Sequence, residues 1–194
     1  MNERATILWR RVDLPGHEFA QLVVGDAGAS LNGIALMSHE AQPCRLEYEI
    51  ECDAAWRTRT ARISGQVGHV PARLQLSCSA KGEWQANGVV VPALQGCIDV
   101  DLGFSPSTNL LPIRRLQLAV GDRAAVRAVW VRFPELSLEV LDQTYTRDSD
   151  TSYVYESGNG TFRRELTVNA HGFVVDYPEM WRVDAAISDA RAVG

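Results

Sequence analysis

The sequence predicts an all-β protein built from a dozen or more short strands with little helix. Three observations predict this class: apolar and polar residues alternate with a period of two in several segments, turn-forming residues separate those segments, and helical spacing is nearly absent. The clearest segment is 44–53, in which Leu46, Tyr48 and Ile50 alternate with charged neighbours. Because tight turns join such short strands, we expect neighbouring strands to run antiparallel.

The same alternation predicts further strands along the chain. These segments are 72–79, 97–102, 124–133, 136–145 and 162–168. Turn residues mark the connections at Asn87-Gly88, Gly121-Asp122, 148–150, 157–160 and 169–172.

Three stretches lack a clear strand pattern. Residues 26–38 fit strand spacing as well as helical spacing, and 185–193 predict only a frayed tail. Residues 103–112 form the longest stretch that we expect to be irregular.

The chain is expected to form one domain that covers residues 1–194. Its 194 residues show no internal repeat and no Pro/Ser-rich linker, and 46% of them are hydrophobic, which is enough to build a core. A dozen antiparallel strands must protect their edges by closing into a barrel, stacking into a sandwich or curling into a half-barrel. Periodicity alone does not choose between these architectures.

Charge argues against nucleic acid as a partner, and hydropathy argues against a membrane-spanning segment. The charge sum, 19 minus 24, gives −5, so the protein lacks the basic field that nucleic acid selects for. No apolar run approaches the ~18 residues of a transmembrane segment, and the N-terminus carries no signal-peptide pattern, so we expect a cytoplasmic protein. The four cysteines, Cys44, Cys52, Cys78 and Cys97, are then expected to be reduced core residues.

Known catalytic and metal-binding patterns are missing from the chain. There is no GxSxG, GxGxxG, GxxxxGK[ST] or HExxH sequence, and the four histidines stand alone without the spacing of metal ligands. We therefore expect no metal, no cofactor and no assignable catalytic residue.

Asp99 and Asp101 form the one carboxylate pair with a chemically suggestive spacing. Residues two apart on a strand share a face, and two carboxylates on one face can divide acid and base work in glycoside cleavage. The alternative is structural: the pair would bind Arg114 and Arg115 and hold the 103–112 loop in place.

Trp56 and Arg57 offer a second candidate site. Arg57, with Arg59 and Arg62, places guanidinium groups beside an aromatic ring, an arrangement that can hold a phosphate or a sugar. Cross-strand pairing with the acidic residues of 47–51 is the structural alternative.

Several longer segments resemble a known family. The string CIDVDLGFSPSTNLLPIRRLQL (97–118), with 52–59, 143–147, 172–183 and, more weakly, 16–22, resembles the bacterial putative glycolipid-binding family. The resemblance covers most of the chain.

The resemblance implies a fold and a set of site residues. It implies that the large antiparallel sheet curls into a half-barrel, similar to bacterial lipoprotein-localisation factors. Together with the Trp56–Arg57 pair, the residues in the matching motifs make up the candidate ligand-binding set: Trp56, Arg57, Asp99, Asp101, Asn109, Arg114, Arg115, Tyr145, Tyr177 and Trp181.

Three functions follow as hypotheses. The first is non-enzymatic binding of a lipid or glycolipid in the concave apolar face of the sheet. The second is a carboxylate-based hydrolase that uses Asp99 and Asp101. The third is a structural or oligomerisation module, a homodimer for example, in which another copy of the chain covers the open apolar face.

Overall fold

The computed structural model describes residues 3–188 and confirms the all-β prediction. Its strands are β1 (Glu3–Arg11), β2 (Gly16–Gly25), β3 (Gly28–His39), β4 (Gln42–Asp53), β5 (Thr58–Val67), β6 (Val70–Cys78), β7 (Trp84–Ala86), β8 (Val89–Val90), β9 (Asp99–Leu102), β10 (Arg123–Arg132), β11 (Ser137–Arg147), β12 (Ser152–Ser157), β13 (Phe162–Val168), β14 (Val174–Tyr177) and β15 (Trp181–Ser188). The helical elements of this range are short: η1 (Pro92–Leu94), η2 (Ser107–Asn109), α1 (Leu110–Leu116) and η3 (Gly158–Gly160).

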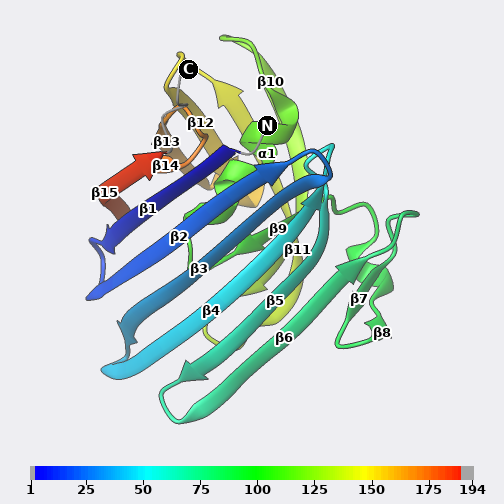
Figure 1. Ribbon diagram of the computed structural model, residues 1–194, viewed down its shortest axis with the longest axis vertical. Helices are drawn as coiled ribbons and strands as arrows, with labels where there is room; N and C mark the ends of the chain where they lie inside the picture. The colour runs from blue at the N-terminus through cyan, green and yellow to red at the C-terminus, as the bar shows by residue number, and fades with distance from the viewer. Residues whose placement is uncertain (1–2, 189–194) are drawn as a thin grey trace.

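All fifteen strands belong to one open sheet (Figure 1). The order is β8-β7-β6-β5-β4-β3-β2-β1-β15-β14-β13-β12-β11-β10-β9, so the first strand of the chain pairs with the last one. Neighbours run antiparallel except β9 and β10, which are parallel. The exception has a simple cause: the connection from β9 to β10 contains η2 and α1 and is long enough for a crossover.

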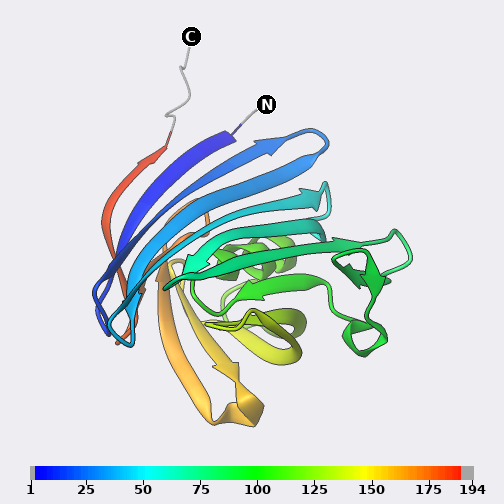
Figure 2. The ribbon, with the colours of Figure 1, turned by 90° about the horizontal axis from the view of Figure 1, so that it is seen from below.

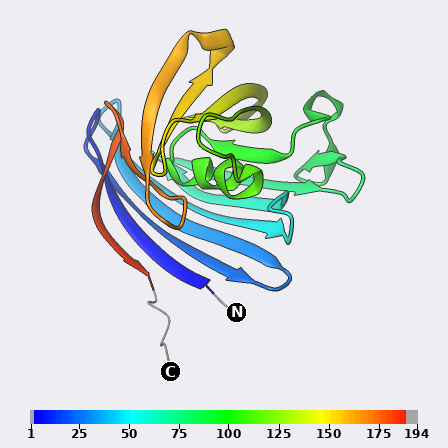
Figure 3. The same ribbon diagram turned by 90° about the horizontal axis from the view of Figure 1, so that it is seen from above.

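The sheet curls so that its two halves face each other, and α1 lies between them (Figures 2 and 3). Phe104, Leu110 and Leu111 are at most 1% exposed and fill much of the concave side. The stretch expected to be irregular, 103–112, contains η2 and the first three residues of α1. The helix was not predictable from spacing, because it has only seven residues, contains Pro112, and begins without a side-chain cap.

Strands of the N-terminal half follow the predicted alternation. In β4, Leu46, Tyr48 and Ile50 are buried on the concave side while Arg45 and Glu49 lie on the exposed side. Three of the four cysteines are buried as expected, and Cys78 is half-buried.

The ends of the chain correct one expectation and decide another. Residues 185–188 are not a frayed tail but part of β15, which pairs with β1. The alternation was hidden because Ala185, Ala186 and Ile187 are all exposed, so backbone pairing rather than burial places them. Residues 189–193 of the expected tail lie outside the described residues. The ambiguous segment 26–38 is the strand β3.

The expected turns lie between elements, as predicted. Asn87-Gly88 joins β7 to β8, and 148–150, 157–160 and 169–172 connect β11 through β14. Gly121-Asp122 differs in kind, because it leads from α1 into β10 rather than closing a hairpin.

Candidate functional site

A cavity of about 330 Å³ opens beside η2 on the inner side of the C-terminal half of the sheet. Five aromatic residues dominate its wall, together with three aliphatic side chains and a few polar groups. We call it the aromatic cavity; its lining includes Asp101, Leu102, Ser105, Asn109, Trp130, Leu141, Tyr155, Ser157, Phe162, Tyr177, Met180 and Trp181.

Strand pairing brings these aromatic side chains together. Trp130 of β10 pairs with Asp101 of β9, and Tyr177 of β14 pairs with Trp181 of β15. The ring centroids of Tyr155 and Phe162 are 5.9 Å apart, and those of Tyr155 and Tyr177 are 6.4 Å apart, both in edge-to-face contacts. Such contacts stabilise each ring in one orientation, so this part of the cavity wall is formed by contacts within the protein itself.

Asp101 is the charged group in this wall. Its Oδ2 accepts a hydrogen bond of 2.6 Å from Nε2 of Gln143, which also donates to the hydroxyl of Tyr155 at 2.9 Å. Burial, with a smaller contribution from the nearby Asp99 carboxylate, raises the pKa of Asp101 to about 6. Within residues 3–188, no ion pair joins Asp101 to an Arg, Lys or His side chain.

Two further predicted residues support the floor of the cavity. The hydroxyl of Tyr145 donates to Oδ1 of Asn109 at 2.8 Å, which links β11 to η2. Tyr145 itself is buried behind the lining. The structure thus brings Asp101, Asn109, Tyr177 and Trp181 to one cavity, with Tyr145 next to it.

Glu18 is a buried acid that the sequence analysis did not single out. It is 0% exposed on β2, and its Oε1 accepts hydrogen bonds from the Tyr48 hydroxyl (2.6 Å) and from Ser105, which lines the aromatic cavity. Burial raises the pKa of Glu18 to about 8, opposed by these hydrogen bonds and by the charge of Arg11. A signal was present: Glu18 occupies the same inward phase of β2 as Ala20 and Leu22.

A glycine makes the Tyr48–Glu18 contact possible. Tyr48 of β4 crosses over Gly33 of β3 to reach Glu18 of β2. A Cβ at Gly33 would lie 2.3 Å from the Tyr48 hydroxyl and ring, so only glycine leaves room for the ring.

Asp99 lies on the same strand face as Asp101 but has a different role. It is 1% exposed, and both of its carboxylate oxygens accept hydrogen bonds from Arg115 of α1. Arg114, expected to share this pair, instead bonds Glu3 at 2.9 Å and stacks on the Trp56 ring at 4.7 Å. Successive helix residues point in directions about 100° apart, so Arg114 and Arg115 cannot both face β9.

Trp56 and Arg57 do not join the aromatic cavity. Arg57 is exposed in the turn before β5, where its backbone N–H donates to Asp53. The neighbouring Arg62 pairs with Glu49, in agreement with the structural alternative for this strip, whereas Arg59 pairs with Asp53, which lies outside 47–51.

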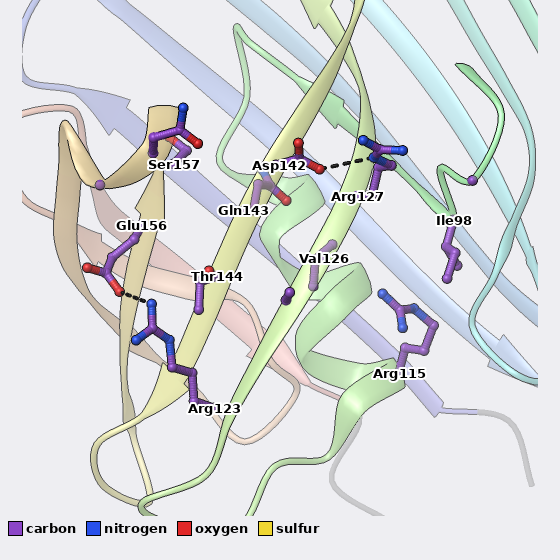
Figure 4. A pocket seen from close by; sticks show the side chains of 14 residues that line it. Ile98, Arg115, Arg123, Val126, Arg127, Asp142, Gln143, Thr144, Glu156 and Ser157 are labelled. Carbon is purple, nitrogen blue, oxygen red and sulfur yellow. Dashed lines mark hydrogen bonds and ion pairs between the residues drawn. The ribbon is translucent and has the colours of Figure 1, made fainter. Parts of the chain in front are cut away.

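A second, larger hollow lies on β10, β11 and β12 (Figure 4). This hollow, which we call the arginine groove, has a volume of about 630 Å³ and is lined by Arg115, Arg123 and Arg127 among others. Each of these arginines is paired: Arg123 with Glu156 (3.2 Å), Arg127 with Asp142 (3.0 Å), and Arg115 with Asp99. The three arginines of the groove are therefore already neutralised by carboxylates of this chain.

The fold and the cavity together define a class of protein: an open, curled β-sheet domain with a preformed internal cavity. A match over residues 6–183 shows that the chain belongs to the family described as "Putative glycolipid-binding". Among the residues that the structure describes, no helix has the length and apolar character needed to cross a bilayer.

Two solved structures are similar to this chain. One is the crystal structure of a DUF1089 family protein from Pseudomonas aeruginosa, with a TM-score of 0.77, 33% sequence identity, and coverage of 86% of this chain and 91% of that chain. The other is a β-barrel-like protein of the DUF1849 family from Brucella abortus, with a TM-score of 0.56, 10% identity, and coverage of 97% and 98%; it shows the fold alone. The search of curated proteins found no match.

Proposed function

We propose that this protein binds an amphipathic lipid or glycolipid without chemical conversion, and that the aromatic cavity is the binding site. One observation carries the proposal: a preformed cavity has a mostly aromatic and aliphatic wall with a small number of polar groups, Asp101, Ser105 and Asn109, at one place. This is the general composition of small-molecule sites, in which apolar area supplies affinity and a few polar groups orient the ligand. The family description agrees with such a ligand.

The size of the cavity limits what it can enclose. A volume of about 330 Å³ is at the small end of known ligand sites. Since Phe104, Leu110 and Leu111 already occupy the middle of the concave side, two full acyl chains do not fit there. The proposed occupant is one sugar ring or the end of a single alkyl chain, and burying about four methylenes would contribute about 3 kcal/mol before the costs of association.

The hydrolase alternative is less well supported than binding. A hydrolase that uses Asp99 and Asp101 needs two carboxylates free to exchange protons or attack. Both oxygens of Asp99 are engaged by Arg115, and the residue is buried, so only Asp101 remains accessible from the cavity.

The module alternative is less well supported than binding. It required an open apolar face that a second copy of the chain would cover. In this structure α1 and the residues before it cover that face from within the same chain.

Displacement of an uncharged fluorescent alkyl probe by octyl glucoside tests the proposal. We expect the wild-type protein to bind both, and Phe162→Ala to weaken both by about tenfold, because half-buried Phe162 forms part of the cavity wall. Phe19→Ala is the matched control: the same change on β2, at a ring that is 44% exposed and does not line the cavity, should leave binding unchanged.

Two results would count against the proposal. One is the absence of probe binding to folded wild-type protein, together with no co-purified lipid in native mass spectrometry. The other is equal binding by the wild type, Phe162→Ala and Phe19→Ala, which would place the ligand outside the aromatic cavity.

A further inference from the structure

We propose that the aromatic cavity selects ligands whose polar group carries a positive charge, an amine or a quaternary ammonium, with Asp101 as the counter-ion. This inference rests on the proposed function, because it assumes that the cavity is the binding site. It goes further by naming the chemical class that the site prefers.

The carboxylate of Asp101 lacks a positive partner of its own. Its Oδ2 accepts from the neutral amide of Gln143, whereas Asp99, two residues away on the same face, is neutralised by Arg115. No cationic side chain of residues 3–188 pairs with Asp101. A carboxylate that is partly removed from water is costly to ionise, and a nearby cation lowers that cost. The negative charge of Asp101 therefore favours a positively charged group in the cavity.

The surrounding rings favour the same charge. Tyr155, Phe162 and Tyr177 form a three-ring cluster with centroids 5.9–6.4 Å apart, next to Trp181 in the cavity wall. The π face of an aromatic ring attracts cations, and several rings around one space are the usual means of recognising quaternary ammonium groups.

The arginines near the cavity do not supply the missing charge. Arg11 stacks on Trp181 at 4.9 Å, Arg132 on Trp130 at 4.9 Å, and Arg164 on Phe162 at 4.8 Å. Each of these guanidinium groups has its own carboxylate partner; in the same order the partners are Asp13, Glu139 and Glu179. Trp130, Phe162 and Trp181 thus each contact an arginine of this chain. None of these arginines pairs with Asp101, so its carboxylate can pair with a cationic ligand.

Because Asp101 can be protonated, the affinity for a cationic ligand should depend on pH. The groups that face Asp101 are Asp99 of β9, Gln143 and Tyr145 of β11, Tyr155 of β12 and Tyr177 of β14, with Arg115 of α1 engaged by Asp99. Burial raises the pKa of Asp101 to about 6, so the carboxylate is charged at pH 8 and largely protonated at pH 5. A cation stabilises only the charged form, so its affinity should fall as the pH drops through 6.

The test compares three ligands that share one tail: octyltrimethylammonium, octyl glucoside and octyl sulfate, below their micellar concentrations, by displacement of the fluorescent probe. At pH 8 we expect the ammonium to bind wild-type protein about tenfold more tightly than the glucoside, and the sulfate to bind most weakly. Asp101→Asn should abolish the preference for the ammonium, and Asp101→Glu, which keeps the charge, should retain part of it. Asp142→Asn, on the exposed pair with Arg127, is the matched control and should retain all of it.

The outcomes separate this inference from the proposed function. Equal affinities for ammonium and glucoside, both weakened by Phe162→Ala, would overturn the charge preference and leave the cavity as the site. Failure of all three ligands to bind would overturn both. If Asp101→Asn does not fold, the pH dependence of the wild-type protein provides the test. The role of Asp101 is contradicted if the affinities for the ammonium and for the glucoside are both the same at pH 8 and pH 5.

Discussion

At the scale of single residues, the most informative side chain is Glu18, an acid placed where the strand pattern calls for an apolar residue. Its contacts with Tyr48 and Ser105 connect β2, β4 and the segment before η2. Its second oxygen, Oε2, is buried and has no hydrogen-bond partner within the described chain. A charged carboxylate in such a place is costly, so the neutral form dominates at neutral pH.

Glu18 should make the folded state less stable as the pH rises. The folded protein keeps the Glu18 proton up to about pH 8, whereas the unfolded chain releases it near 4.5. Unfolding therefore releases a proton between pH 4.5 and pH 8. The contribution of Glu18 to the free energy of unfolding is complete below pH 4.5 and falls by about 1.4 kcal/mol per pH unit up to pH 8. Glu18→Gln, which is always neutral, should show a free energy of unfolding that declines much less between pH 5 and pH 8.

Urea unfolding at the two pH values measures this difference. Glu165→Gln, an exposed acid on β13, is the control and should keep the pH dependence of the wild type. If Glu18→Gln keeps it as well, Glu18 is ionised in the folded protein.

At the scale of elements, α1 decides what the concave side can hold. The helix is fixed at its C-terminal end by two adjacent arginines with different partners: Arg115 to buried Asp99, and Arg114 to Glu3 and the His171 carbonyl. The first pair has side chains 15% and 1% exposed, the second 24% and 31%. Burial therefore predicts that the two arginines differ in energetic importance.

Arg115→Ala should destabilise the protein by about 3–5 kcal/mol, because it leaves the Asp99 carboxylate buried without a partner. Arg114→Ala, its neighbour on the same helix, should cost only about 1–2 kcal/mol, since its ion pair is partly hydrated and its stacking on Trp56 is a modest contribution. Chemical denaturation of both variants checks the prediction. Equal losses would mean that the Asp99–Arg115 pair is not the main attachment of α1.

At the scale of the whole molecule, one continuous sheet joins the two halves that face each other. β1 pairs with β15, and Nε1 of Trp9 donates to the carbonyl of Val174 at 2.6 Å, across 165 residues of sequence. The Glu18–Ser105 and Arg114–Glu3 contacts also connect the N-terminal strands to the segment around α1. Neither half can lose its structure without exposing the apolar side of the other.

We therefore expect a single cooperative unfolding transition. The midpoints from far-UV circular dichroism and from tryptophan fluorescence should coincide in urea. Trp9→Phe, which removes the bond to Val174, should lower both midpoints together. Two separate midpoints would show that the halves β1–β8 and β9–β15 unfold independently.

Much of the architecture and part of the candidate site could be predicted from local pattern. Period-two alternation located strands such as β4 and β13, because one face of each strand is apolar and the other is not. It missed α1, which is too short to show helical spacing, and the pairing of residues 185–187, whose side chains are exposed. Asp101, Asn109, Tyr177 and Trp181 were predicted as site residues, whereas Glu18 was not, because its partners are 30 and 87 residues away.

The sequence by itself determined the all-β class and the alternation of buried and exposed residues, and its candidate set included four of the residues that line the cavity, Asp101, Asn109, Tyr177 and Trp181. Only the tertiary structure decided that Phe104 and α1 fill much of the concave side, that Arg115 neutralises Asp99 while Asp101 has no cationic partner among residues 3–188, and that Glu18 is buried against Tyr48. The physical reason is distance along the chain: alternation is a property of adjacent residues, whereas the pairing of a charge or the filling of a cavity depends on groups that only the folded sheet brings together.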